Sequence, residues 1–586
     1  MMNWHSKSTM SSVAVSLAAL LLASVDSSDL IAAERTLSDF KAYAAERLPQ
    51  LGDTPLDRFV RMVDKDGDGV ISDVEFDDRL ATLQKLSQSS SQPEPIKSTS
   101  ETATGMSPST VLLITSDELA AAWEPFAIWK TRNGKATKIV TIGQIQQQYE
   151  ADGIQEKIRL CVRHHIDNHK TRWVVLGGDC EPDGKGLVPG GHTTVHAQER
   201  SGIPTDIVYL SETDWDADED GIYGEWEEDR EAISYPDGTV GLGRVPVRSA
   251  ADVAAFTDKV IAYESHYPTS DFAKQMIYTC TDSPAYPKVR NSWDGYVSKV
   301  WEGGQAGRFF SAETPWDEQG SPGSHQLSAD NLVALINAKT TGKLHIHGHG
   351  LLPLWALEDS KFTAQHVNQL SNETAYPLIT TVSCFTGQYD GKEDPSIVES
   401  MIRQPKGGSV AIVAPIRTGK PHVHQPSDFR RMVSEGKLDG TTQTMTRYWS
   451  NGLGSGLTTG EALMKAKADM VVDAQKTAGY HLCICELNLL GDPTLDMRAN
   501  IPRSPKLECP SSIATGKQSV EVITDAPGST VCLWKGNEVY IVTTTDADGK
   551  AKCSIEPTSA GNLSVTVSGT NLNSVMKSIS VNEQRQ

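Results

Sequence analysis

Residues 344–350 read LHIHGHG and residues 380–387 read TTVSCFTG, and these two segments decide the fold of the chain. Each has the short, apolar or β-branched character of a buried strand and ends at polar residues. Between them, residues 360–370 have the apolar spacing of a helix. A strand, a helix and a second strand predict a right-handed crossover between parallel neighbours. We therefore expect His349 and Cys384 at adjacent carboxyl ends of an open α/β sheet, where ligand sites form.

A cysteine and a histidine at such an edge suggest nucleophilic catalysis, because an imidazole can take the proton of a thiol or stabilise its thiolate. Gly350 and the small residues around Cys384 would let the backbone N–H groups of Gly350 and Cys384 approach a developing oxyanion. Two other interpretations use the same residues. Cys384 is also compatible with a buried structural thiol. His345, His347 and His349 alternate along the chain, so on one strand they would share a face and could bind zinc.

The motifs around this pair resemble those of gingipain-type cysteine peptidases, which form peptidase family C25 of the caspase-like clan. The family's Gly-His-Gly and small-residue-Cys segments match residues 348–350 and 383–384. Further matches follow the same order over roughly residues 110–500: LGGD at 176–179, VGLGRVPV at 240–247, GSVAI at 408–412 and GDPTL at 491–495. The resemblance implies a caspase-like, parallel-sheet α/β catalytic region that hydrolyses peptide bonds through His349 and Cys384.

The resemblance leaves the third catalytic group open. The family commonly has a carboxylate just before its VGR strand, which could orient the histidine. Asp237 is the nearest acid in this chain, and Thr239 lies close to the same position. The resemblance therefore implies either a triad completed by Asp237 or a Cys–His dyad. Residues 415–426 lie where gingipains wall their specificity pocket, but this segment lacks an aromatic residue, so a preference for arginine or lysine is not carried over.

The length and charge of the chain bound its organisation. It has 586 residues, too many for one hydrophobic core, and a formal net charge of −21, which argues against nucleic acid as a partner. We expect an α/β protein with added modules at both ends. The predicted order is a signal peptide at 1–33, an EF-hand module at 34–85, a linker at 86–108, a gingipain-like N-terminal α/β subdomain at 109–250, a caspase-like catalytic subdomain at 251–502 and an immunoglobulin-like β-sandwich at 503–586.

The N-terminus indicates export. Lys7 precedes the apolar run VAVSLAALLLASV at 13–25, which is too short to span a bilayer comfortably and is typical of a secretory signal peptide; an uncleaved anchor is the alternative. No other stretch is long and apolar enough to span a membrane. We therefore expect a protein that is secreted, periplasmic or at the cell surface. Nine cysteines leave at least one thiol unpaired, and Cys532 and Cys553 are candidates for a disulfide.

Residues 64–75 (DKDGDGVISDVE) follow the EF-hand calcium loop position by position. The alternating acids supply oxygen ligands, a glycine permits the turn, and the last residue can bind in a bidentate manner. The expected Ca²⁺ ligands are Asp64, Asp66, Asp68, the carbonyl of Val70, and Glu75; a solvated acidic loop is the alternative.

A second acidic loop lies within the catalytic region. Residues 216–222 (DADEDGI) repeat the same order of acids, glycine and apolar residue, without flanking EF-hand helices. Catalytic domains of the resembled family often carry a calcium loop here, and a solvated acidic loop is the alternative. The expected Ca²⁺ ligands are Asp216, Asp218, Asp220, Ile222, Glu225 and Glu227.

These features together predict a secreted, calcium-binding cysteine endopeptidase with a protein or peptide substrate. The alternative is a catalytically inactive calcium-binding cell-surface or adhesion protein on the same scaffold. The presence of both His349 and Cys384 favours the enzyme.

Overall fold

A computed structural model describes the chain in segments. They are residues 110–180, 187–195, 202–280, 328–357, 360–391, 395–420 and 440–583, with the backbone of β1 Arg35–Thr36, β2 Val70–Ile71, β10 Gln305–Phe310 and β11 His325–Gln326. The chain divides into two compact units, residues 1–101 and 102–586. In the first unit, β1 pairs with β2 in antiparallel fashion. The predicted signal peptide, the linker and the EF-hand ligands other than Val70 lie outside the described residues.

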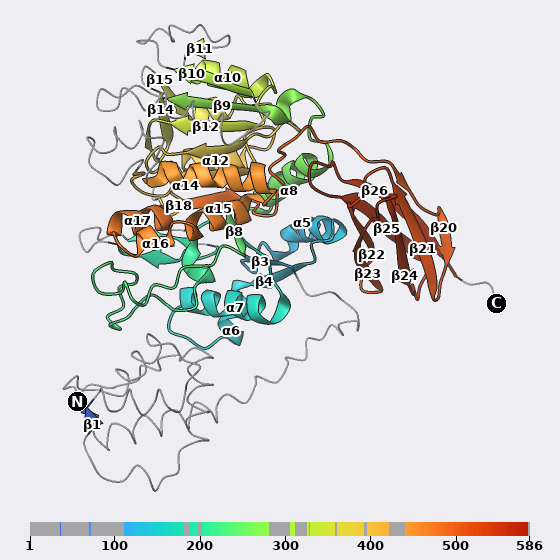
Figure 1. Ribbon diagram of the computed structural model, residues 1–586, viewed down its shortest axis with the longest axis horizontal. Helices are drawn as coiled ribbons and strands as arrows, with labels where there is room; N and C mark the ends of the chain where they lie inside the picture. The colour runs from blue at the N-terminus through green and yellow to red at the C-terminus, as the bar shows by residue number, and fades with distance from the viewer. Residues whose placement is uncertain are drawn as a thin grey trace. The chain divides into compact units, whose positions relative to one another are not determined.

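The second unit is built on an eleven-stranded mixed sheet, ordered β11-β10-β9-β12-β16-β17-β18-β8-β5-β3-β4 (Figure 1). Its other strands are β3 Val111–Thr115, β4 Thr137–Thr141, β5 Trp173–Gly177, β8 Gly241–Val245, β9 Gln275–Cys280, β12 Lys343–His347, β16 Leu378–Thr381, β17 Ala411–Pro415 and β18 Leu487–Gly491. Neighbouring strands are parallel except β17 and β18. The sheet therefore consists of two parallel blocks that run in opposite directions and meet between β17 and β18.

The helices pack against this sheet and share one hydrophobic core with it. Their bounds are α5 Ala120–Arg132, α6 Ile142–Gln148, α7 Ile154–His169, α8 Ala250–Ser265, α10 Ala329–Asn337, α11 Ala364–Val367, α12 Ile397–Arg403, α14 Gly440–Trp449, α15 Thr459–Ala468, α16 Val471–Ala474 and α17 Ala478–Glu486. A single cluster of buried apolar side chains extends from Val111 to Met497 and includes strands of both blocks. Among the described helices, none combines the length and the apolar character needed to cross a membrane.

The predicted crossover is confirmed in its strands and corrected in its connection. β12 and β16 are parallel neighbours, with Lys343 opposite Leu378. The connection is not a helix over 360–370: it contains the antiparallel sheet of β13 His349–Leu351, β14 Leu354–Leu357 and β15 Ser360–Thr363, followed by the short α11. Phe362 lies opposite Trp355 in this sheet, both rings are buried, and their centroids are 5.3 Å apart. This cross-strand pair favours the extended conformation over a helix at 360–363.

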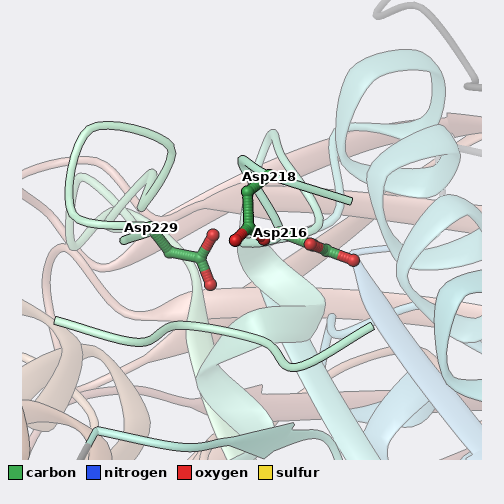
Figure 2. A group of neighbouring side chains, drawn as sticks. All are labelled: Asp216, Asp218 and Asp229. Atoms are coloured by element: carbon green, nitrogen blue, oxygen red, sulfur yellow. The ribbon is translucent and has the colours of Figure 1, made fainter. Parts of the chain in front are cut away.

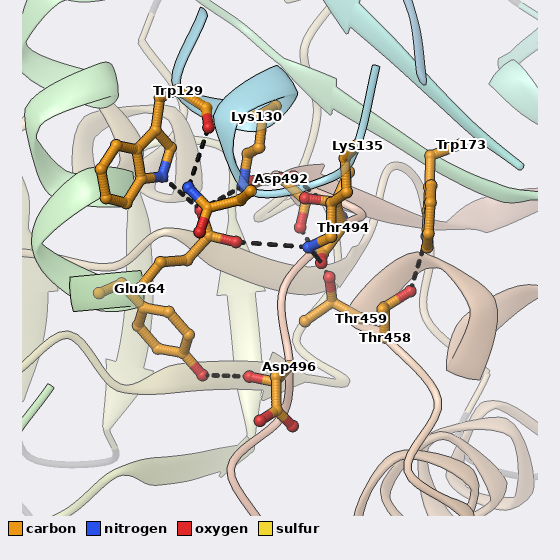
Figure 3. Close-up of polar contacts among 12 residues, drawn as sticks. Trp129, Lys130, Lys135, Trp173, Glu264, Thr458, Thr459, Asp492, Thr494 and Asp496 are labelled. Atoms are coloured by element: carbon orange, nitrogen blue, oxygen red, sulfur yellow. Dashed lines mark hydrogen bonds and ion pairs between the residues drawn. The ribbon is translucent and has the colours of Figure 1, made fainter. Parts of the chain in front are cut away.

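A buried ion network connects the GDPTL segment to α5 and α8 (Figure 3). Lys130 of α5 is fully buried, and its Nζ lies 2.6 Å from Asp492 and 2.8 Å from Glu264 of α8. Trp129 Nε1 donates a second bond to Glu264 at 2.7 Å. Burial alone would lower the pKa of Lys130. The carboxylates of Asp492 and Glu264 together outweigh the effect of burial, so the pKa of Lys130 is raised. Asp492 therefore has a structural role in joining β18 to α5.

Two β-sheets with a separate apolar core follow the catalytic region. One contains β19 Leu507–Glu508, β21 Gln518–Thr524 and β24 Lys550–Ile555; the other contains β20 Ser512–Ala514, β26 Val575–Asn582, β25 Gly561–Ser568, β22 Thr530–Lys535 and β23 Val539–Thr544. They form a sandwich, and its classification as immunoglobulin-like stays a prediction.

The predicted disulfide between Cys532 and Cys553 is wrong, because both thiols are free. Side chains alternate between the two faces of a strand. This places Cys532 on the outer face of the sandwich, where its Sγ donates to the carbonyl oxygen of Thr131 at 3.4 Å. Cys553 instead lies in the core of the sandwich.

Candidate active site

Cys384 lies in a tight turn at the carboxyl end of β16. Backbone hydrogen bonds fix the turn to its neighbours: Val382 N donates to Ile346 O at 3.1 Å, and Phe385 N donates to Arg417 O at 2.7 Å. Phe385 has a φ of +61°, a left-handed conformation that is unfavourable for an aromatic residue. Such strain persists where the surroundings over-determine it and is common at functional sites.

The thiol of Cys384 is half-buried, and its Sγ donates to Gly419 O at 3.8 Å. Burial raises the pKa of this thiol, and the negative charge of Glu486 raises it further. Glu486 is itself buried and accepts a hydrogen bond from Lys420 N at 3.2 Å, so it lies behind the segment that contacts the thiol. A thiol in this environment needs a nearby base in order to react as a thiolate.

The Gly348-His349-Gly350 segment brings the histidine to this turn. His349 begins β13 and is exposed to solvent. A Cβ atom at Gly350 would lie 2.8 Å from the carbonyl oxygen of Cys384 and 2.5 Å from Cγ2 of Thr386. The two segments therefore approach more closely than any residue with a side chain would allow. The strand that starts with His349 therefore packs directly against the cysteine turn, although β12 itself ends at His347.

The alternative zinc site does not form. β12 ends at His347 and His349 starts a different strand, so the three histidines do not share one strand face. His345 is fully buried, shares a 2.7 Å hydrogen bond with Thr380 Oγ1, and burial holds its pKa well below the usual range. Within the described segments, only Asp216, Asp218 and Asp229 bring three potential metal ligands close together.

The structure does not bring Asp237 to the catalytic pair. Its carboxylate accepts hydrogen bonds from the backbone N–H and the hydroxyl of Thr239, at 2.9 and 2.6 Å. Asp237 precedes β8, and three strands separate β8 from β12. At about 4.8 Å per strand, that offset is about 19 Å. Asp237 is therefore held locally by Thr239 and lies away from the segment of His349.

The acidic loop gathers three carboxylates in one place (Figure 2). One oxygen from each of Asp216, Asp218 and Asp229 lies within 4.8 Å of the others. Asp220 is adjacent and accepts a hydrogen bond from Ile222 N at 2.7 Å. Two of the expected ligands, Asp216 and Asp218, are thus brought together, and the third member is a residue that the sequence did not indicate.

Asp229 lies beyond the acidic repeat, so no spacing rule identifies it. It is fully buried and accepts hydrogen bonds from Gly224 N and Glu225 N, at 2.8 and 3.1 Å. Burial, with the charges of neighbouring acids, raises the pKa values of Asp216 and Asp229. Burial and the neighbouring Glu228 raise the pKa of Glu225, another expected ligand, to about 7. The side chain of Glu227, also an expected ligand, is exposed to solvent. A divalent cation would relieve this repulsion, and oxygen ligands of this kind suit Ca²⁺.

A thiol turn and a glycine-flanked histidine thus lie side by side at one edge of a mixed α/β sheet. The sequence profile of peptidase family C25 matches residues 106–498, and the chain belongs to this family. It is 22% identical over 466 residues to Gingipain R2 of Porphyromonas gingivalis strain W83, covering 78% of this chain and 55% of that protein. The match to Gingipain R1 of the same species is 21% identical and covers 41% of that protein. The chain therefore spans about half the length, or less, of these curated relatives.

Solved structures show the same fold. The crystal structure of the Arg-specific cysteine proteinase gingipain R superposes with a TM-score of 0.57 at 20% identity, covering 82% of this chain and 99% of that one. The complex of the pro- and mature domains of RgpB from Porphyromonas gingivalis gives a TM-score of 0.55 at 20% identity, covering 80% of this chain and all of that one.

Proposed function

We propose that this protein is a secreted cysteine endopeptidase that hydrolyses peptide bonds through a dyad of Cys384 and His349. The observation that carries the proposal is the close approach of Gly350 to the Cys384 turn, because it puts a base and a nucleophile on adjoining segments. Membership of family C25 supports the reaction type. The signal-like run at 13–25 supports export.

The chemistry follows from the two side chains. His349 takes the proton of Cys384, and Sγ attacks the carbonyl carbon of the substrate. Backbone N–H groups of Gly350 and Cys384 stabilise the resulting oxyanion. His349 then gives the proton to the leaving amine, and water hydrolyses the thioester to regenerate the thiol. Burial of the thiol makes the imidazole necessary, since it keeps Cys384 mainly protonated near neutral pH.

We also propose that the protein binds Ca²⁺ at two loops. In the catalytic region the ligands are Asp216, Asp218 and Asp229, with the other expected ligands Asp220, Ile222, Glu225 and Glu227 completing the shell. In the N-terminal module, Asp64, Asp66, Asp68, Val70 and Glu75 follow the EF-hand order. Calcium has no chemical step here; it would fix the loops in one conformation.

The reaction is tested with Cys384→Ala in the full-length protein. The variant should lose peptide hydrolysis by more than about a thousandfold, because no other group replaces the nucleophile. Its melting temperature should stay close to that of the native protein, because a thiol contributes little packing beyond a methyl group. Cys509→Ala, in the β-sandwich, is the matched control and should keep activity. A native protein that binds calcium but cleaves no member of a peptide library would favour the inactive adhesion protein.

A further inference from the structure

Arg417 contacts the cysteine turn at two points. Its backbone carbonyl accepts the hydrogen bond from Phe385 N at 2.7 Å, directly after Cys384. Its guanidinium binds the carboxylate of Asp390 in a bidentate manner: Nη1 lies 2.8 Å from Oδ1, and Nη2 lies 2.6 Å from Oδ2. Asp390 comes six residues after Cys384. One residue therefore holds both ends of the segment that follows the thiol.

The ion pair between Asp390 and Arg417 is largely buried. The side chain of Asp390 is 6% exposed and that of Arg417 is 14% exposed, and Arg417 Nε also donates to Gly202 O at 3.2 Å. A buried pair contributes little stability in comparison with well-packed apolar side chains, because both charges lose their hydration. Two parallel N–H···O bonds instead fix the distance and the angle between the two side chains. The pair therefore contributes mainly a fixed geometry to the turn.

The segment that contains Arg417 also contacts the thiol. Gly419, two residues further along, accepts the hydrogen bond from Cys384 Sγ at 3.8 Å. A Cβ atom at Gly419 would lie 2.5 Å from the carbonyl oxygen of Val382, so this segment packs closely on the turn. A shift of Arg417 would therefore also move the carbonyl group that contacts the thiol.

The turn needs this restraint because it contains a strained residue. The φ of +61° at Phe385 persists only where the surrounding structure over-determines it. The bond to Arg417 O restrains the N–H group of Phe385, and the ion pair restrains the chain at Asp390. Beside Asp390, the buried ring of Tyr389 packs on the guanidinium of Arg244, which lies 4.7 Å from the ring centroid. The far end of the turn is thus anchored in the core.

We propose that Asp390 and Arg417 are positioning residues, whose ion pair holds the strained turn so that Sγ of Cys384 keeps a fixed place relative to His349. Neither side chain takes part in a chemical step. The alignment of the nucleophile affects the chemical step rather than substrate binding, so the pair acts on kcat and not on KM. This inference rests on the proposed peptidase function.

The test measures kcat, KM and melting temperature in single and double variants of the pair. In Asp390→Asn, kcat should fall by about tenfold while KM stays within about twofold, because a displacement of less than about 1 Å already misaligns a reacting group. Arg417→Lys keeps the charge without the two parallel bonds, so it should also lose kcat. Arg417→Met with Asp390→Leu leaves no buried charge unpaired. It should therefore recover most of the melting temperature lost in Asp390→Asn, but not the kcat.

Glu156→Gln is the matched control. Glu156 forms a bidentate pair with Arg159 on α7, at 2.7 and 2.8 Å, outside the cysteine turn, and its substitution should leave kcat unchanged. Arg417→Lys and the double variant decide the question if Asp390→Asn does not fold.

The outcomes separate the positioning role from the activity itself. A native kcat in Asp390→Asn or Arg417→Lys, a double variant that recovers kcat together with melting temperature, or a change confined to KM would overturn the positioning role and leave the peptidase intact. A native protein that hydrolyses no peptide, or hydrolysis that survives Cys384→Ala, would instead overturn the proposed function.

Discussion

The cysteine turn and the acidic loop are both strained, but different forces hold them. Each contains a residue other than glycine in a left-handed conformation: Phe385 at φ +61°, and Trp215 and Glu219 at +71° and +60°. The cysteine turn is bonded to its neighbours in the sheet, through Ile346 O and Arg417 O. The acidic loop is bonded largely to its own carboxylates, which accept hydrogen bonds from residues 217–225.

The geometry of the cysteine turn is set by the sheet, whereas the geometry of the acidic loop depends on the charge state of its carboxylates. Hydrogen bonds to strands in a buried core persist without an ion. Three clustered carboxylates repel one another unless a cation or protons neutralise them. The acidic loop nevertheless contacts α17: the carbonyl of Gly224 lies 3.3 Å from Nε2 of the buried His481, and α17 ends at Glu486 behind the thiol. Loss of the proposed Ca²⁺ ion should therefore lower the stability of the protein more than it changes the rate of peptide hydrolysis.

The largest effect is expected where the two catalytic segments touch. In Gly350→Ala, the new Cβ atom would collide with Cys384 O and Thr386 Cγ2 and push the histidine strand away from the thiol. A displacement of about 1 Å can cost about a hundredfold in rate, so kcat/KM should fall by about that factor. Gly454→Ala is the matched control, because a Cβ atom there meets nothing within 4 Å. Native-like kinetics in Gly350→Ala would show that the contact is not needed for catalysis.

The acidic loop should contribute to stability through calcium. With free Ca²⁺ at a hundredfold excess over Kd, the gain in the free energy of unfolding should be about 2.7 kcal/mol. Asp216→Asn with Asp229→Asn should remove most of this gain, as read from melting temperatures in calcium and in chelator. Glu75→Gln should weaken calcium binding at the EF-hand loop and leave the calcium-dependent gain of the catalytic region intact. The same melting temperature in calcium and in chelator for the native protein would contradict a structural ion in the acidic loop.

A smaller effect, on the reactivity of Cys384, is expected when the buried negative charge of Glu486 behind the thiol is removed. Glu486→Gln keeps an acceptor for Lys420 N and removes a negative charge that raises the pKa of Cys384. The thiolate should then form at lower pH, so the rising limb of the pH–rate profile should move to lower pH. The measurement is the pH dependence of Cys384 alkylation by iodoacetamide, with Glu508→Gln in the β-sandwich as control. A shift to higher pH would contradict the electrostatic role of Glu486.

The sequence predicts the parts of the fold that depend on local pattern. Strands β12 and β16 and their parallel pairing follow from two apolar runs with polar ends. The antiparallel sheet between them could not be predicted, because Phe362 fits a helix face as well as a strand, and its buried partner Trp355 is visible only in the tertiary structure.

In the candidate site, too, some residues can be predicted from local sequence pattern and others only from the tertiary structure. His349, Gly350 and Cys384 are marked by glycine spacing, since a close backbone approach leaves a trace in the sequence. Asp229 and Glu486 leave no such trace: Asp229 is one acid among several in residues 225–231, Glu486 is a single acid at the end of α17, and only their burial in the folded chain distinguishes them. The distance of Asp237 from His349 likewise depends on the strand order of the sheet, which no local pattern shows.

The central claim is that Cys384 is the nucleophile and His349 its base. The most direct measurement is intact-mass analysis and peptide mapping after treatment with a peptidyl acyloxymethyl ketone whose sequence matches a cleaved substrate. One adduct should form on Cys384, with no adduct in Cys384→Ala and a labelling rate in His349→Ala lowered by at least about a hundredfold. An adduct on another of the nine cysteines, or hydrolysis that continues after Cys384 is fully labelled, would contradict the account.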